Sequence, residues 1–171
     1  SGWVGSASSL PTRVVTPSEH QRTRVREYGA SEATTTVVPD GIDFPTITAT
    51  DPGERVDVAF AARLDDDSNL EDLLLALAEL REAGEWTATV VGDGPERAAF
   101  ETQARDLRLG DRVEFVGDCP REERVAIYRG AHTFVQTARR QPFAWELLWA
   151  LACGCVGVVE LQGDSSAHEL V

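Results

Sequence analysis

The stretch TATVVGDGPERAAFETQARDLRL, residues 87–109, decides the fold of this chain. It begins with a short run rich in valine and threonine at 87–92, turns through Gly-Asp-Gly-Pro at 92–95, and continues as a helical pattern over 95–109. Glycine suits a tight turn, and proline suits the first turn of a helix. The stretch therefore predicts a strand, a turn and a helix in direct succession.

The same alternation of strand and helix continues on both sides of this stretch. It is typical of parallel βαβ units, so we predict an α/β fold, a Rossmann-like doubly wound parallel sheet with helices on both faces. Ser18 and Gln21 form a capping-box pattern at the start of the first helix. The expected strands are 13–16, 35–38, 56–61, 87–92, 112–117, 133–136 and 156–160. The expected helices are 18–29, 69–84, 95–109, 121–130 and 143–153.

The charge balance limits the classes of partner. The chain has 29 acidic and 16 basic residues and a net charge of −13, and every basic residue is arginine. Phosphate backbones and anionic membranes need a cationic surface, so we expect no nucleic-acid partner. An acidic chain without lysine is typical of extreme halophiles, in which salt screens the repulsion between like charges. An acidic protein from a mesophile is the alternative.

The cysteines indicate a reducing compartment. Cys119, Cys153 and Cys155 are odd in number and lack the spacing of a disulfide scaffold, which favours a cytoplasmic location. The pair Cys153-x-Cys155 has metal ligands as one interpretation, and buried small apolar side chains as the favoured one. The chain begins with Ser rather than Met, so we expect an excised part of a longer protein.

Several predicted strands end in residues that suit a ligand. Ligands of open parallel sheets bind beyond the carboxyl ends of the strands, where glycines let the backbone approach and helix N-termini offer free N–H groups. Arg63 follows one strand, Gly92 and Gly94 follow the next, and Gly117 ends a third. A further loop, ARRQPFAWE at 138–146, leads into the last long helix. Together they predict a binding site at this edge of the sheet.

From Arg13 to Val171 the chain resembles the second half of the family 4 glycosyltransferases, retaining enzymes with the GT-B fold of two facing Rossmann-like domains. The resemblance is carried, in order, by VVTPSE, VVPDGID, ARL, VVGDGPER, RVEFVGDCPREE, IYRGAHTFV, RRQPFAWELLWALACG and HELV. It implies that residues 1–38 are the end of an N-terminal acceptor domain, 39–54 an interdomain linker and 55–171 the domain that binds the nucleotide-sugar donor.

The resemblance also implies partners and a reaction. A hexosyl group would pass from the nucleotide sugar to an acceptor held by the protein's own N-terminal domain, with a lipid-linked acceptor at the membrane surface as one possibility. It implies no metal and no cofactor apart from the substrate, so Asp65-Asp66-Asp67 is interpreted as an acidic turn. The alternatives are a non-catalytic glycosyltransferase-like binding or partner protein, and another enzyme on this fold such as a sugar-nucleotide epimerase.

The resemblance assigns donor-binding roles residue by residue. Arg63 matches an arginine that contacts the diphosphate, and Ser68 stands where the family has a lysine. The remaining matches contribute mainly backbone near the donor. They are Gly92 and Gly94 facing the nucleotide, Gly117 and Cys119 along the base, and Phe143 and Ala144 facing the sugar and phosphate.

The family's paired glutamates, separated by seven residues, fall on Gln141 and Trp149. Gln141 keeps hydrogen-bonding atoms but loses the charge, and Trp149 has no acceptor. Glu146 is the local replacement acid, and its alternative role is that of an acid stabilising the first turn of a helix. Trp149 either forms an apolar wall for the nucleoside at the cleft edge or packs in the core.

The excess of acidic residues predicts that stability depends on salt. The Debye length grows from about 3 Å at 1 M salt to about 10 Å at 0.1 M, so repulsion among the 29 acids should lower the melting temperature in dilute KCl. Thermal melts in molar and dilute KCl measure this effect. An unchanged midpoint would contradict the halophilic interpretation.

Overall fold

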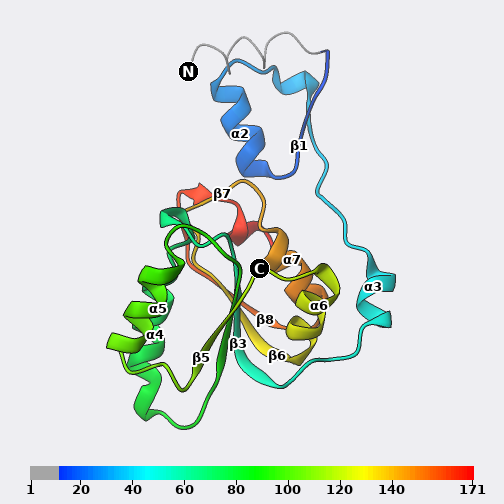
Figure 1. Ribbon diagram of the computed structural model, residues 1–171. Coiled ribbons are helices and arrows are strands. Elements are labelled where there is room, and N and C mark those ends of the chain that lie inside the picture. Colours follow the sequence, from blue (N-terminus) through cyan, green and yellow to red (C-terminus); the bar gives the residue numbers. More distant parts are fainter. Residues whose placement is uncertain (1–11) are drawn as a thin grey trace.

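A parallel sheet of five strands forms the centre of the computed structural model, which describes residues 12–171 (Figure 1). The strands lie in the order β5-β4-β3-β6-β8, and every neighbouring pair is parallel. The predicted doubly wound fold is therefore confirmed. The strands are β3 (Val56–Ala61), β4 (Ala88–Val91), β5 (Val113–Gly117), β6 (Ala131–Gln136) and β8 (Val156–Val159).

Helices cover both faces of this sheet (Figure 1). Phe60 and Leu64 pack with α4 (Leu70–Glu79) and α5 (Arg97–Asp106) in one core. Ala59, Ala61 and Phe134 belong to the opposite core, with α6 (Arg121–Gly130) and α7 (Trp145–Ala152). Successive residues of a strand point to opposite faces, so a single strand such as β3 contributes to both cores.

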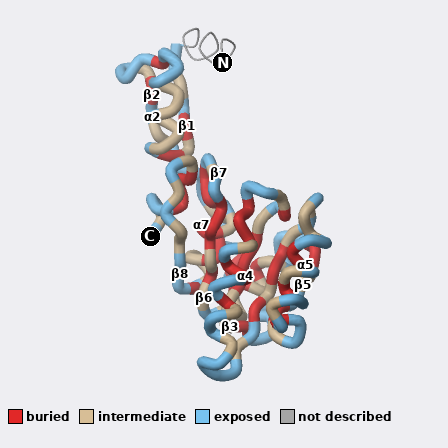
Figure 2. The backbone as a smooth tube through the Cα atoms, turned by 90° about the vertical axis from the view of Figure 1, so that its left-hand side faces the viewer, coloured by how far each residue is buried: buried red, intermediate tan, exposed pale blue. Residues whose placement is uncertain are grey.

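A small parallel unit precedes the main domain. It consists of β1 (Val14–Thr16), α2 (Glu19–Glu27) and β2 (Thr35–Val37), and most of its residues are intermediate or exposed (Figure 2). The Ser18 hydroxyl accepts from the Gln21 N–H at 3.1 Å, which confirms the predicted cap. The division at residues 38 and 54 stays a prediction, and residues 1–11 of the expected remnant lie outside the described residues.

The small unit contacts the main domain through the start of α2. The Glu169 carboxylate accepts from the backbone N–H groups of Glu19 and His20 at 2.9 and 2.7 Å. Ser18 also donates its hydroxyl hydrogen to the Pro142 carbonyl at 3.0 Å. A carboxylate at a helix N-terminus satisfies free donors and complements the helix dipole. These contacts join the small unit to Glu169 and to the loop that precedes α7.

The predicted linker at 39–54 contains a helix that the sequence analysis missed. It is α3 (Phe44–Ala49), which has proline in its first turn and buries Ile47. The Arg129 guanidinium of α6 donates to the carbonyls of Ile47 and Thr50. Contacts with a distant helix therefore stabilise a turn whose own sequence lacks helical periodicity.

Short elements complete the described part of the chain. They are β7 (Arg140–Gln141), β9 (Asp164–Ser165) and the 3-10 turns η1 (Glu32–Thr34), η2 (Asp66–Ser68), η3 (Leu80–Glu82) and η4 (Ala167–Glu169). Among residues 12–171, no helix has the length and apolar character needed to cross a membrane.

Gly130 allows the end of α6 to touch the segment before β3, and we predict that Gly130→Ala destabilises the fold. A Cβ at this position would overlap the Glu54 carbonyl oxygen and lie 3.0 Å from that of Gly53. The expected loss in the free energy of unfolding is about 1–3 kcal/mol, measured by urea denaturation. Gly110→Ala is the control, because nothing lies within 4 Å of its Cβ. Equal stabilities of the two variants would contradict this steric argument.

Candidate functional site

A cleft of about 920 Å³ lies beyond the carboxyl ends of β3, β4 and β6. Loops after these strands line it, as expected for a parallel sheet. The cleft brings together most of the predicted site residues from distant parts of the sequence. These are Arg63, Ser68, Gly92, Gly94, Gln141 and Glu146.

Two glycines bring the loop after β4 against the loop after β3. A Cβ at Gly92 would overlap the Ala62 carbonyl oxygen, and a Cβ at Gly94 would overlap that of Leu64. Gly92 also has a φ of +125°, which side chains rarely adopt. The fold itself therefore requires both glycines, and their predicted contact with a nucleotide stays a prediction.

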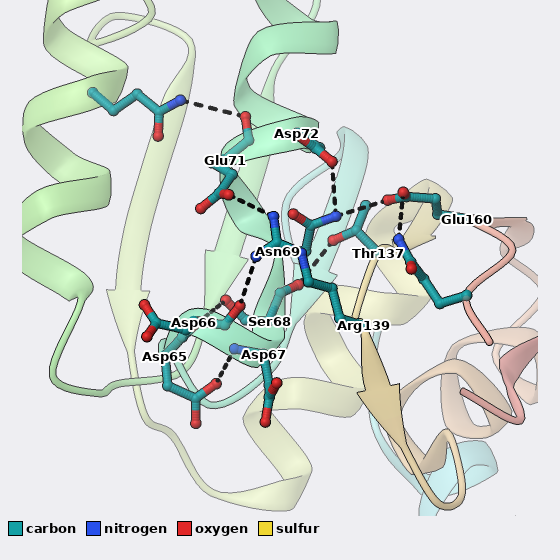
Figure 3. Close-up of polar contacts among 12 residues, drawn as sticks. Asp65, Asp66, Asp67, Ser68, Asn69, Glu71, Asp72, Thr137, Arg139 and Glu160 are labelled. Carbon is teal, nitrogen blue, oxygen red and sulfur yellow. Dashed lines mark hydrogen bonds and ion pairs between the residues drawn. The ribbon is translucent and has the colours of Figure 1, made fainter. Parts of the chain in front are cut away.

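The turn between β3 and α4 is fixed by a polar network (Figure 3). Asn69 has a left-handed backbone with φ of 52°, and its Nδ2 donates to Asp72 and Glu160, both at 2.9 Å. Thr137 donates its hydroxyl hydrogen to the Ser68 carbonyl at 3.0 Å. The network joins the cleft wall at Ser68 to the segment after β6 and to Glu160 after β8.

The acidic run at 65–67 has the geometry of a capped turn. The Asp65 carboxylate accepts from the Asp67 N–H at 3.2 Å at the start of η2. Within the described residues, no group of His, Cys, Asp and Glu side chains is arranged to hold a metal ion.

Glu146 is held by two donors at the cleft wall. Arg124 Nη1 and Tyr128 Oη each lie 2.6 Å from one of its carboxylate oxygens. Burial of the Tyr128 phenol, together with the negative charge of Glu146, raises the Tyr128 pKa well above its ordinary value of 10.0. Tyr128 therefore stays protonated and donates to a carboxylate whose position is fixed.

Trp149 lies in the core and does not line the cleft. It is 7% exposed, and the Arg121 guanidinium lies 5.1 Å from the centre of its ring. With Cys119 it lines a neighbouring cavity of about 640 Å³, which shares Glu146 with the cleft. Trp149 thus packs in the core and also lines this cavity, so neither alternative is decided by its position. A contact between this cavity and a nucleoside stays a prediction.

The other predicted residues, Gly117, Phe143 and Ala144, do not line the cleft. Gly117 ends β5, and its carbonyl accepts from the Gly92 N–H at 2.7 Å. Phe143 and Ala144 are buried in front of α7, which begins at Trp145 rather than at Phe143. The loop predicted at 138–146 contains β7, which pairs with β9.

Hydrogen bonds from distant and neighbouring side chains hold the residues just before α7. The Ser18 and Ser166 hydroxyls both donate to the Pro142 carbonyl, at 3.0 and 2.9 Å. Gln141 Nε2 donates to the Phe143 carbonyl at 2.9 Å. The Pro142 carbonyl therefore has partners outside the helix, and the Phe143 carbonyl also accepts from the Trp145 N–H at 3.1 Å. Residues 142 and 143 bend, and α7 begins after them.

Several residues that line the cleft were not assigned to it from the sequence, among them two arginines and a tryptophan. Arg124 comes from α6, Arg140 from β7 and Trp145 from the start of α7. Arg140 follows the predicted strand that ends at residue 136, whereas Arg124 lies within the predicted helix at 121–130 and has no such signal, because arginine is also common on solvated helix faces.

Comparisons with known proteins identify relatives of this chain. Residues 48–162 match the sequence family described as "Glycosyl transferases group 1". A curated relative, the 2-deoxystreptamine glucosyltransferase of Streptomyces kanamyceticus, is 28% identical over 143 residues, which are 75% of this chain and 37% of that protein.

Solved structures share the fold. HepE of Anabaena in complex with UDP and glucose has a TM-score of 0.83 at 21% identity, covering 99% of this chain and 49% of that one. Sucrose-phosphate synthase from Thermosynechococcus elongatus has a TM-score of 0.77 at 21% identity, covering 93% and 43%. The chain thus spans less than half the length of each of these proteins.

The raised pKa of Tyr128 predicts a loss of stability at alkaline pH. The unfolded phenol ionises near pH 10 and the folded one above it, so the stabilisation is complete below about pH 10 and is lost as pH rises further. Tyr128→Phe should cost about 1–3 kcal/mol at neutral pH by removing a hydrogen bond to a carboxylate.

Urea denaturation between about pH 8 and 11 measures both effects. The free energy of unfolding should fall less steeply with pH in Tyr128→Phe than in the unmodified chain. Cys155, whose pKa burial raises to about 11, is common to both proteins and cancels from the comparison. Identical slopes would contradict the assignment.

Proposed function

This chain belongs to the group 1 glycosyl transferases, and from this membership we propose that its cleft binds the nucleotide-sugar donor of a retaining hexosyl transfer. The observation that carries the proposal is the cleft beyond β3, β4 and β6, which combines close-packed glycine turns with arginines from separate loops. The donor diphosphate needs both backbone access and positive charge. Assignment to family 4 and a haloarchaeon-like source are part of this proposal.

Uridine diphosphate is the first nucleotide to test. Structures of HepE, which shares the fold, hold UDP, UDP-glucose, or UDP with glucose. Arg63 is exposed at the cleft and suits a diphosphate oxygen. We assign the base and ribose to the neighbouring cavity, where Cys119 and Trp149 lie and which adjoins the cleft at Glu146.

The transferred sugar is assigned to the cleft beside Gln141 and Glu146. Retaining transfer passes through an oxocarbenium-like transition state, which a nearby carboxylate stabilises. Gln141 has a side-chain oxygen for a sugar hydroxyl, because its amide nitrogen already donates to the Phe143 carbonyl. Glu146 provides the carboxylate of α7 at the cleft, and Arg124 and Tyr128 hold it in position.

The remaining parts of the reaction are assigned to the rest of the full-length protein. The acceptor, with a lipid-linked molecule at the membrane surface as one candidate class, would bind the N-terminal domain of which β1, α2 and β2 are the end. No metal and no cofactor besides the nucleotide sugar is proposed. We assign the reaction to the cytoplasm.

We predict that this chain binds UDP in the micromolar range or more weakly and transfers no sugar alone. Ser68 and Trp149 replace a charged contact and a ribose acceptor, at about 1.5–3 kcal/mol each, so affinity should be at least tens-fold below that of a fully equipped relative. Calorimetry with UDP and UDP-glucose measures the affinity.

Sub-micromolar binding would contradict the argument about Ser68 and Trp149, and transfer by this chain alone would contradict the domain assignment. The full-length protein should transfer the sugar in high salt. Donor binding by the full-length protein without hydrolysis or transfer would favour the non-catalytic alternative.

A further inference from the structure

We propose that Arg140 supplies the positive charge that holds the donor's diphosphate, in place of a cation at position 68. This inference rests on the proposed function and adds a residue that neither the sequence motifs nor the resemblance assigns. It follows from which charges in the cleft are already neutralised and which one is not.

Position 68 has no group left for a phosphate. Ser68 is 2% exposed, and its hydroxyl donates to the Asp65 carbonyl at 2.6 Å. Its own carbonyl accepts from Thr137 at 3.0 Å. The Ser68 hydroxyl and carbonyl are therefore both committed to neutral hydrogen bonds, and this side chain offers neither a cation nor a free donor.

The cleft would repel an anion unless one of its cations had no carboxylate partner. Its acidic lining residues outnumber its arginines, which are Arg63, Arg124 and Arg140. A diphosphate entering such a site gains less from a guanidinium that already has a carboxylate partner, such as Arg124 or Arg63, than from one that has none. The acids that line the cleft are Asp65, Asp67, Asp93, Asp118 and Glu146.

Arg140 is the uncommitted cation. Arg124 pairs with Glu146 at 2.6 Å and with Asp118 at 3.1 Å, and Arg63 lies 3.3 Å from Asp65. In the part of the chain that the structure describes, the Arg140 guanidinium makes neither an ion pair nor a hydrogen bond, although it lines the cleft. Its full charge is available to a ligand.

The backbone of Arg140 is held in place even though its side chain is free. Arg140 pairs with Asp164 in the parallel β7–β9 bridge, and Gln141 pairs with Ser165. The next carbonyl, that of Pro142, accepts from Ser18 and Ser166. A guanidinium on a fixed backbone loses less entropy on binding than one on a mobile loop. It also adjoins Gln141, where we assign the sugar.

The preceding arginine shows the opposite arrangement and provides a matched control. Arg139 Nη2 lies 2.6 Å from the Glu71 carboxylate, and the Arg139 N–H donates to the Asp67 carbonyl at 2.9 Å (Figure 3). Arg139 does not line the cleft. Replacing either arginine changes the net charge of the protein equally, so a difference between them reports their local roles.

The test compares Arg140→Gln and Arg139→Gln by calorimetry, with UDP and with uridine as probes. Loss of a charge-assisted contact to the diphosphate should weaken UDP binding about tenfold in Arg140→Gln. Uridine has no phosphate, so its affinity should change less than about twofold. Arg139→Gln should keep UDP affinity within the same twofold margin, after circular dichroism confirms that both variants are folded.

Arg140→Lys separates charge from the loss of side-chain volume. It keeps a cation at the site, so it should retain most of the UDP affinity that Arg140→Gln loses. A loss in Arg140→Lys as large as that in Arg140→Gln would overturn the charge assignment, as would equal UDP affinities of Arg139→Gln and Arg140→Gln. Absence of UDP binding to the unmodified chain would instead overturn the proposed function and the inference with it.

Discussion

The close approach of two backbone turns is the constraint on which the candidate site depends. Gly92 and Gly94 let the turn after β4 rest on the carbonyls of Ala62 and Leu64, where no Cβ would fit. Hydrogen bonds then join the turns in both directions, from the Leu64 N–H to the Asp93 carbonyl and from the Glu96 N–H to the Leu64 carbonyl, each at 3.0 Å. The floor of the cleft is therefore backbone, and the side chains that define its chemistry come from the loops around it.

The charged side chains around the cleft affect an anion differently from the net charge of the whole chain. A net charge of −13 opposes the entry of an anion at long range, and salt weakens this effect. Within the cleft, the acids are partly neutralised by specific arginines, such as Arg124 between Asp118 and Glu146. A strongly acidic protein can thus contain an anion site, because contacts at hydrogen-bond distance outweigh a screened field.

The sequence predicted what local pattern controls and missed what distant contacts control. The strand at 56–61 and the Ser18 cap were correct, because a short apolar run with β-branched residues and a hydroxyl three residues before Gln21 are local signals. The helix α3 was missed, and the start of α7 was predicted two residues too early. Arg129 stabilises α3, and Ser18 and Ser166 hold the loop that precedes α7. Arg140 could not be distinguished from Arg139, because only the fold shows which one has a carboxylate partner.

The apolar ring at Trp149 and the carboxylate at Glu146, both on α7, are explained by the same physical argument. The core packs an apolar ring at Trp149, where an ionised carboxylate would lose its hydration. One turn earlier, Glu146 is only partly buried and has two donors, one charged and one a buried phenol. A carboxylate is less costly at that position, because its hydrogen bonds and the helix N-terminus compensate for lost water. The helix therefore places its acid at the cleft rather than in the core, which is the physical reason for proposing Glu146, and not position 149, as the carboxylate that acts on the sugar.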